Sequence, residues 1–179
     1  MALYQNRFEN DGLYDLIKEN LEGKHNLIGI EIGSYRGEST EIFVKSRVFS
    51  KLYCIDPWEP FYDPDDLAAT PEIALAEEEF NNRFNGSDTV IKVKKKSDDA
   101  VYLFADESID FIYIDGNHMY EFVKRDLIHY VPKIKPGGII SGHDFGNDHY
   151  GVAQAVLEYF NNQQPLHRYK DCSWVYIKA

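Results

Sequence analysis

Short apolar runs ending in glycine or aspartate alternate with longer segments of helical spacing along almost the whole chain. The five apolar runs cover residues 27–33, 52–56, 90–93, 109–115 and 138–144. Continuous runs of this kind, rich in isoleucine and valine, are typical of strands that are buried on both faces of a parallel sheet. The alternation therefore predicts a doubly wound α/β sheet with right-handed crossovers.

The segments between these runs carry the spacing and the end signals of helices. Helices are expected over residues 38–49, 71–84, 98–105, 120–131 and 151–160. The fourth of them places apolar residues three and four apart and stops before Pro132. Two further strands are expected at 166–169 and 173–177, and the tight turn between them predicts that they pair antiparallel.

The 179 residues are expected to form a single domain, 1–179. A helical segment over 1–25 is expected to precede the first strand. Residues 57–85 hold a Pro-rich, acidic and aromatic stretch followed by a helix. Irregular stretches of this length inside a compact domain are usually functional, so we expect this region to contribute a lid over the site.

The chain is acidic, with 30 Asp and Glu against 19 Lys and Arg and a formal charge of −11. Nucleic-acid binding needs clustered basic residues, so no nucleic-acid partner is expected. The N-terminal residues are too polar for a signal peptide, and no apolar run approaches the roughly 20 residues that span a membrane. We therefore expect a cytoplasmic protein with no membrane partner.

Ligands of open α/β sheets bind beyond the carboxyl ends of the strands. After the first strand, Gly33 permits a tight turn and Gly37 a close backbone approach, so a ligand can lie on the loop amides. Glu31 would repel a pyrophosphate but could accept hydrogen bonds from an ammonium group. The spacing matches neither common phosphate-binding signature, and a plain strand-to-helix turn is the alternative.

The second strand ends at Asp56, where a carboxylate can bind both hydroxyls of a ribose. Two residues later, Trp58 offers a flat face for an adenine. The structural alternatives are an Asp-Pro turn for Asp56 and core packing for Trp58.

Two aspartates and two histidines follow the fourth and fifth strands. Asp115 and His118 follow the fourth, and His143 and Asp144 follow the fifth, with His149 just beyond as a residue expected to line the pocket. Neighbouring strands would bring these side chains together as a site for Mg²⁺ or a similar hard cation. A histidine beside such a site is a candidate general base. Each residue alone is more often structural, but their expected co-location favours function.

Four segments together resemble the class I S-adenosylmethionine-dependent methyltransferases: EIGSYRGEST (31–40), CIDPW (54–58), FIYIDGNHMYEFVKRDL (111–127) and KPGGIISGHDF (135–145). The last two resemble the metal-dependent subgroup of small-molecule O-methyltransferases that act on sugar and macrolide hydroxyls. The resemblance spans about residues 27–177. It implies a Rossmann-like methyltransferase fold with a mostly parallel sheet and a C-terminal antiparallel hairpin.

The resemblance also implies roles for individual residues. His118 would be the catalytic base that takes the proton of the acceptor hydroxyl. Asp115 and Asp144 would bind a divalent cation such as Mg²⁺, and His143 stands where several relatives have a further acidic ligand. S-adenosylmethionine would be bound by Glu31, Gly33, Ser34, Tyr35, Gly37, Ser39, Asp56, Trp58, Ser97, Asp98 and Asp115.

The expected activity is metal-assisted methyl transfer from S-adenosylmethionine to a hydroxyl of a small molecule. One alternative is an NAD(P)-dependent Rossmann oxidoreductase, against which the absent G-x-G-x-x-G and the presence of Glu31 count. Another is a non-catalytic module that binds S-adenosylmethionine or a metabolite. Since the chain is short for this group, loops or the second subunit of a homo-oligomer would have to complete the acceptor pocket.

Overall fold

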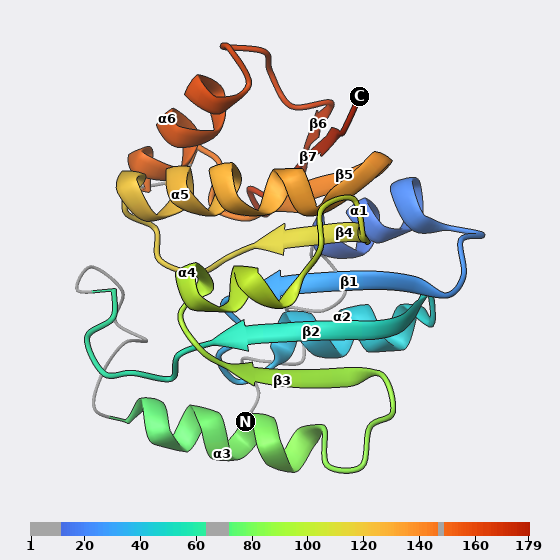
Figure 1. Cartoon of the computed structure of the whole chain (residues 1–179), viewed down its shortest axis with the longest axis vertical. Coiled ribbons are helices and arrows are strands. Elements are labelled where there is room, and N and C mark those ends of the chain that lie inside the picture. The colour runs from blue at the N-terminus through green and yellow to red at the C-terminus, as the bar shows by residue number, and fades with distance from the viewer. Residues whose placement is uncertain (1–11, 64–71, 147–148) are drawn as a thin grey trace.

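A computed structural model describes residues 12–63, 72–146 and 149–179 (Figure 1). Its strands form one seven-stranded sheet in the order β3-β2-β1-β4-β5-β7-β6. The strands are β1 (Leu27–Ile32), β2 (Phe49–Asp56), β3 (Val90–Lys94), β4 (Ile109–Ile114), β5 (Ile134–Gly142), β6 (His167–Arg168) and β7 (Trp174–Ile177). The helices are α1 (Gly12–Leu21), α2 (Glu38–Ser46), α3 (Ile73–Arg83), α4 (Ser97–Ala100), α5 (Tyr120–Tyr130) and α6 (Tyr150–Tyr159).

The pairing of the strands confirms the predicted doubly wound fold. Strands β1 to β5 pair in parallel through the contacts β3-β2, β2-β1, β1-β4 and β4-β5. Strand β7 runs antiparallel to both β5 and β6, so the C-terminal hairpin is also confirmed. This order and the alternating helices match a Rossmann-like methyltransferase fold.

The ends of several elements differ from the sequence-based expectation. The helix predicted over 38–49 ends at Ser46, because Arg47 adopts a left-handed conformation (φ 59°) and its N–H bonds to Val44. Strand β2 consequently begins at Phe49 rather than at residue 52. Strand β5 begins at Ile134, four residues before the predicted start. The helix predicted over 98–105 is the short α4 followed by a 3₁₀ turn.

Some predicted features lie outside the described residues. They are residues 1–11 of the expected N-terminal helical segment and residues 64–71, which include part of the expected lid and the first residue of the helix expected over 71–84. Within the described ranges, none of the helices combines the length and apolar character needed to cross a membrane.

Apolar cores lie on both faces of the sheet. On one face, α4, α5 and α6 pack residues such as Ala100, Leu127 and Val156 against Ile30 and Ile112. On the other face, α1, α2 and α3 pack against β1, β2 and β4. Figure 1 shows α2 behind the sheet and α4 in front of it. Because both faces are covered, the strands read as continuous apolar runs in the sequence.

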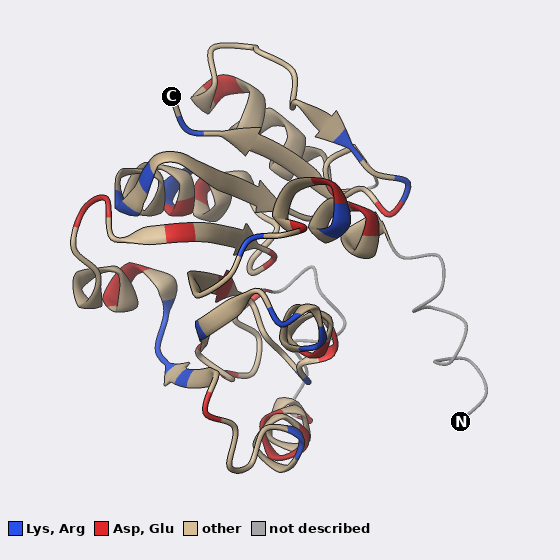
Figure 2. Ribbon diagram, turned by 90° about the vertical axis from the view of Figure 1, so that its right-hand side faces the viewer, with Lys and Arg blue, Asp and Glu red and all other residues tan. Residues whose placement is uncertain are grey.

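The short basic run near β3 belongs to a mixed surface of both charges. Lys92 and Lys94 both donate to Glu77 of α3 at 2.6 Å, and Lys96 pairs with Glu59 at 3.0 Å. Figure 2 shows acidic and basic residues interspersed along the ribbon. These pairs account for the run as ordinary surface ion pairing.

The parallel strands all have their carboxyl ends on the same side of the sheet, at the left of Figure 1. Four loops leave the strands there. They cover residues 33–37 after β1, 57–63 after β2, 115–119 after β4 and 143–146 after β5. Most of the candidate residues lie on these loops, and the others lie in the strand or helix next to a strand end: Glu31, Ser39, Asp56, Ser97 and Asp98. The fold therefore brings the candidates to one side of the sheet.

Candidate functional site

The turn after β1 is locked to the turn after β4. Gly33 adopts φ +86°, and a Cβ at this position would lie 1.9 Å from the carbonyl oxygen of Asp115. Gly33 N–H donates to Ile55 and Asp115 N–H donates to Ile32, each at 2.8 Å. Only glycine fits this close approach, so Gly33 sets the position of Asp115.

Gly33→Ala is expected to destabilise the fold more than Gly86→Ala does. Both glycines have positive φ, which costs about 1–2 kcal/mol for alanine, but nothing lies within 4 Å of a Cβ at Gly86. The clash at Gly33 adds about 1–3 kcal/mol of overpacking. Chemical denaturation of both variants measures the difference; equal losses would contradict the proposed lock between the two turns.

Glu31 lies inside the protein rather than on the surface of the site. Its side chain is fully buried and accepts hydrogen bonds from the hydroxyls of Ser34, Ser39 and Thr40. Burial raises the pKa of Glu31 to about 7, although these hydrogen bonds work in the opposite direction. In this structure the carboxyl braces the glycine loop and the start of α2 through these three hydroxyls, and its expected contact with a ligand's ammonium group stays a prediction.

Asp56 joins the loops that follow β1 and β2. Its carboxylate accepts the backbone N–H of Tyr35 at 2.9 Å and that of Trp58 at 2.7 Å. Burial raises the pKa of Asp56, against these two hydrogen bonds. Its place at the end of β2 is as expected, and a contact with ribose hydroxyls stays a prediction.

Trp58 is a core side chain, which is the alternative interpretation of the sequence. Only 4% of the residue is exposed, its indole N–H donates to Tyr35, and its ring lies 5.2 Å from that of Phe80. Lys92 approaches the ring to 4.6 Å. Hardly any of the ring is left open for an adenine, so the expected stacking role does not fit this structure.

Gly37, Ser97 and Asp98 also make structural contacts. The space where Gly37 lacks a side chain is filled by the ring of Phe84. The carbonyl of buried Ser97 accepts the Tyr130 hydroxyl at 2.8 Å, and Asp98 pairs with Arg125 at 3.3 Å. Contacts of these three residues with a cofactor stay predictions.

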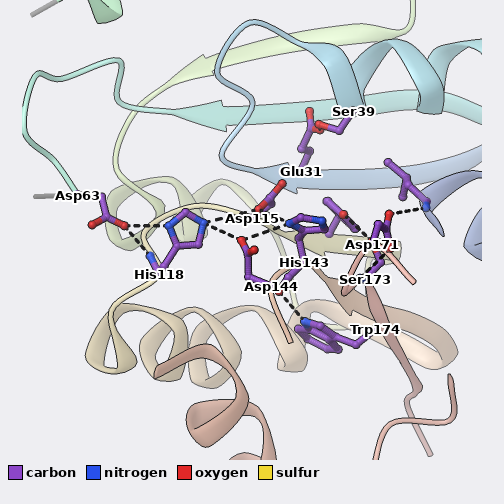
Figure 3. Close-up of polar contacts among 12 residues, drawn as sticks. Glu31, Ser39, Asp63, Asp115, His118, His143, Asp144, Asp171, Ser173 and Trp174 are labelled. Carbon is purple, nitrogen blue, oxygen red and sulfur yellow. Dashed lines mark hydrogen bonds and ion pairs between the residues drawn. The ribbon is translucent and has the colours of Figure 1, made fainter. Parts of the chain in front are cut away.

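The structure brings Asp115, His118, His143 and Asp144 together, as the sequence predicts (Figure 3). His118 Nε2 lies 3.0 Å from Asp144 Oδ2 and 3.9 Å from Asp115 Oδ1. His143 Nδ1 lies 3.2 Å and 3.7 Å from the same two carboxylate oxygens. His149 stacks on His118 at 4.2 Å between ring centroids, and its expected place lining a pocket stays a prediction. The turns after β4 and β5 thus form one polar cluster.

The two carboxylates control the charge of the two histidines. Burial alone would lower the pKa of His118, but hydrogen bonds and charge from Asp115 and Asp144 outweigh it and raise the pKa to about 11. The same carboxylates raise the pKa of His143 to about 9 against its burial. In turn, the two histidines hold the pKa of Asp144 well below its usual range, although burial opposes this. The two carboxylates therefore favour the charged form of both histidines.

The C-terminal hairpin positions His143 and Asp144. Trp174 Nε1 donates to the carbonyl of His143 at 3.1 Å, and Phe145 N–H donates to Cys172 at 3.0 Å. Asp144 itself is left-handed, with φ 60°. The loop after β5 is therefore shaped by contacts from β7 and the turn before it.

The donor set fits a divalent cation. One oxygen or nitrogen from each of Asp115, His143 and Asp144 lies within 4.8 Å of the others, and the same holds for His118, Asp144 and His149. Carboxylate oxygens suit Mg²⁺ and Mn²⁺, and imidazole nitrogens suit the later transition ions. Asp144 is common to both groups, so it is the central residue of the cluster.

Asp63 was missed by the sequence analysis. It is 5% exposed, and one of its oxygens, Oδ2, lies 2.8 Å from His118 N and 3.1 Å from His118 Nδ1. The sequence placed it in an acidic stretch expected to act as a lid, but nothing in the pattern distinguished it from the other acids there. Its partner is 55 residues away, so only the fold reveals the contact.

Comparison with known proteins gives matches at the level of family and fold. Residues 30–145 match the family model described as "Methyltransferase domain". A functionally uncharacterised protein of Acanthamoeba polyphaga mimivirus is 29% identical over 136 residues, and the match covers 72% of this chain but only 58% of that protein.

Two solved structures have similar folds. The O-methyltransferase NovP superimposes with a TM-score of 0.66 at 16% identity, over 98% of this chain and 79% of that one. A candidate rRNA methylase of Clostridium thermocellum gives a TM-score of 0.62 at 14% identity, over 93% of both chains. At these identities the similarity concerns the fold alone.

Proposed function

Because the chain belongs to the methyltransferase-domain family and to the class I S-adenosylmethionine-dependent methyltransferases, we propose that it methylates a hydroxyl group of a small molecule with the help of a divalent cation. The observation that carries the proposal is the convergence of Asp115, His143 and Asp144 beside His118. This cluster adjoins the glycine turn through the contact of Gly33 with Asp115. Family membership also counts against the oxidoreductase alternative.

We assign the cofactor to the edge formed by the loops after β1 and β2. There the backbone N–H of Tyr35 is held by Asp56, and Gly33 brings Asp115 alongside. The half-exposed Tyr35 and Asp115 can meet a ligand directly, whereas Glu31 and Trp58 are enclosed and shape the loop from inside. The cofactor's sulfonium methyl is already a strong electrophile, so the protein mainly has to align the acceptor oxygen with it.

His118 is assigned as the base that takes the proton of the acceptor hydroxyl. Its Nε2 faces Asp144 at 3.0 Å, and its side chain is 14% exposed, so the ring is not fully enclosed. As the acceptor oxygen forms a bond to the methyl carbon, the carbon–sulfur bond breaks towards sulfur and the hydroxyl proton passes to Nε2. The cation would be held by Asp115, His143 and Asp144. When bound, it would lower the pKa of a coordinated hydroxyl and offset the carboxylate charge that raises the pKa of His118.

The proposal is tested with S-adenosylmethionine that carries a labelled methyl group. The protein is incubated with Mg²⁺ or Mn²⁺ and with sets of small molecules as acceptors. The members of one set share a skeleton and differ in carrying a hydroxyl, an amine or a carboxyl group. We expect label on a hydroxyl oxygen, identified by mass spectrometry and NMR. Label on amines alone would contradict O-methylation, and cofactor binding without transfer to any set would favour a non-catalytic module.

A further inference from the structure

The loop after β2 is attached to the turn after β4 by its last described residues, Tyr62 and Asp63. Figure 3 shows Asp63 beside His118. The Asn117 side-chain amide donates to the carbonyl of Tyr62 at 2.8 Å. Next to it, Asp63 Oδ2 accepts from the backbone N–H of His118 at 2.8 Å and lies 3.1 Å from Nδ1 of the same residue. Three polar contacts thus join two loops that are 55 residues apart in sequence.

Contacts other than those with His118 also fix the position of this segment. The ring of Tyr62 packs edge-on against Phe122 of α5 at 5.7 Å, and Lys96 lies 5.5 Å from the same ring. Tyr62 therefore seats the loop on α5, and the neighbouring Asp63 is presented to His118 from a supported backbone. Asp63 is 5% exposed, so water competes little for its carboxylate.

Asp63 Oδ2 contacts both the main chain and the ring of His118, and these two contacts together fix the rotation of the ring. For Nδ1 to hydrogen-bond to a carboxylate it must carry a proton, and this leaves Nε2 as the ring atom that can exchange a proton. Nε2 is the atom that faces Asp144, at 3.0 Å. Asp63 thus contacts the opposite side of the ring from the proposed cation ligands.

We infer that Asp63 is a positioning residue, which orients His118 and keeps the proton on Nδ1 so that Nε2 receives the proton of the acceptor. This is the relation between a base and its orienting group that recurs in hydrolytic sites. The inference rests on the proposed role of His118 as base. It also gives residues 57–63 a defined task, since this segment links Asp56 at the end of β2 to His118.

The test compares Asp63→Ala and Asp63→Asn with the unmodified protein in the presence of Mg²⁺ and S-adenosylhomocysteine. The ring nitrogens of ¹⁵N-labelled histidines are observed by NMR, and His118 is assigned from the signals missing in His118→Ala. In Asp63→Ala we expect the Nδ1 proton to exchange with water at least about tenfold faster. Asp63→Asn should retain much of the protection, because its amide oxygen can still accept both bonds.

Kinetics and a matched control separate positioning from general damage. On an acceptor found with labelled methyl groups, Asp63→Ala is expected to lose about 100-fold in kcat with little change in KM, and Asp63→Asn to recover part of it. Asp106→Asn removes an exposed carboxylate that pairs with Lys133 and should change neither measurement. Thermal unfolding checks that all variants are folded.

An unchanged Nδ1 signal in folded Asp63→Ala would overturn the inference, whatever the activity. If the Nδ1 signal changes in Asp63→Ala but His118→Ala still transfers methyl groups fully, His118 is refuted as the base. The orienting contact of Asp63 would then still stand. Failure of the inference and failure of the proposed function are therefore distinguishable.

Discussion

His118→Ala is expected to lower the kcat of methyl transfer by about 10²–10⁴-fold, the usual contribution of a positioned general base. The ring of His118 lies nearest to Asp63, Asp144 and His149, which are not assigned to the cofactor. Asp115, which is assigned to it, lies 3.9 Å from the ring and is held in place by its own backbone bond to Ile32. The Kd for S-adenosylhomocysteine should therefore stay within about twofold. Single-turnover rates with labelled S-adenosylmethionine, together with calorimetric titration, measure both quantities.

The matched control is His129→Ala, which removes another histidine that faces an aspartate, Asp98, at 3.4 Å. It lies in the last turn of α5 and should leave turnover unchanged. Equal activity of His118→Ala and the unmodified protein would contradict the assignment of the base. Equal losses in both histidine variants would point to damage to α5 instead.

Asp144→Asn is expected to weaken binding of a divalent cation by at least about 100-fold, since changing even the outer partners of metal ligands costs 10–100-fold. Asp144 belongs to both groups of converging donors, and its Oδ2 lies near both His118 and His143. Asparagine is the best-suited replacement, because it tolerates the left-handed backbone found at this position. Calorimetric titration with Mn²⁺ in the presence of S-adenosylhomocysteine gives the change in affinity.

Asp106→Asn is again the matched control, because that carboxylate is exposed and pairs only with Lys133 among the contacts described. It should bind Mn²⁺ as the unmodified protein does. If Asp144→Asn binds Mn²⁺ with full affinity, the cation lies elsewhere and the assignment of Asp115, His143 and Asp144 fails.

The sequence is sufficient to predict the sheet and the edge where the site lies, because both depend on local patterns. Apolar runs followed by glycine or aspartate mark the buried strands and their carboxyl ends, and parallel pairing then brings the turns at Asp115 and at His143–Asp144 together. That step needed no knowledge of packing beyond the α/β topology.

Burial at the site could not be predicted, because it depends on elements distant in the sequence. Glu31 is enclosed by hydroxyls from α2 and its preceding loop, and Trp58 is covered by Phe80 of α3. The type and position of Glu31 indicate a ligand contact, and for Trp58 the sequence leaves a stacking role and core packing open as alternatives. The contact of Asp63 with His118 likewise depends on how Tyr62 packs on α5, which no local pattern encodes.

The central claim is that a divalent cation at Asp115, His143 and Asp144 assists methyl transfer to a hydroxyl. Its most direct test is the rate of labelled methyl transfer to a hydroxylated acceptor before and after chelation with EDTA. We predict that EDTA abolishes transfer and that added Mg²⁺ or Mn²⁺ restores it, with no restoration in Asp144→Asn. A rate that EDTA leaves unchanged would contradict the account.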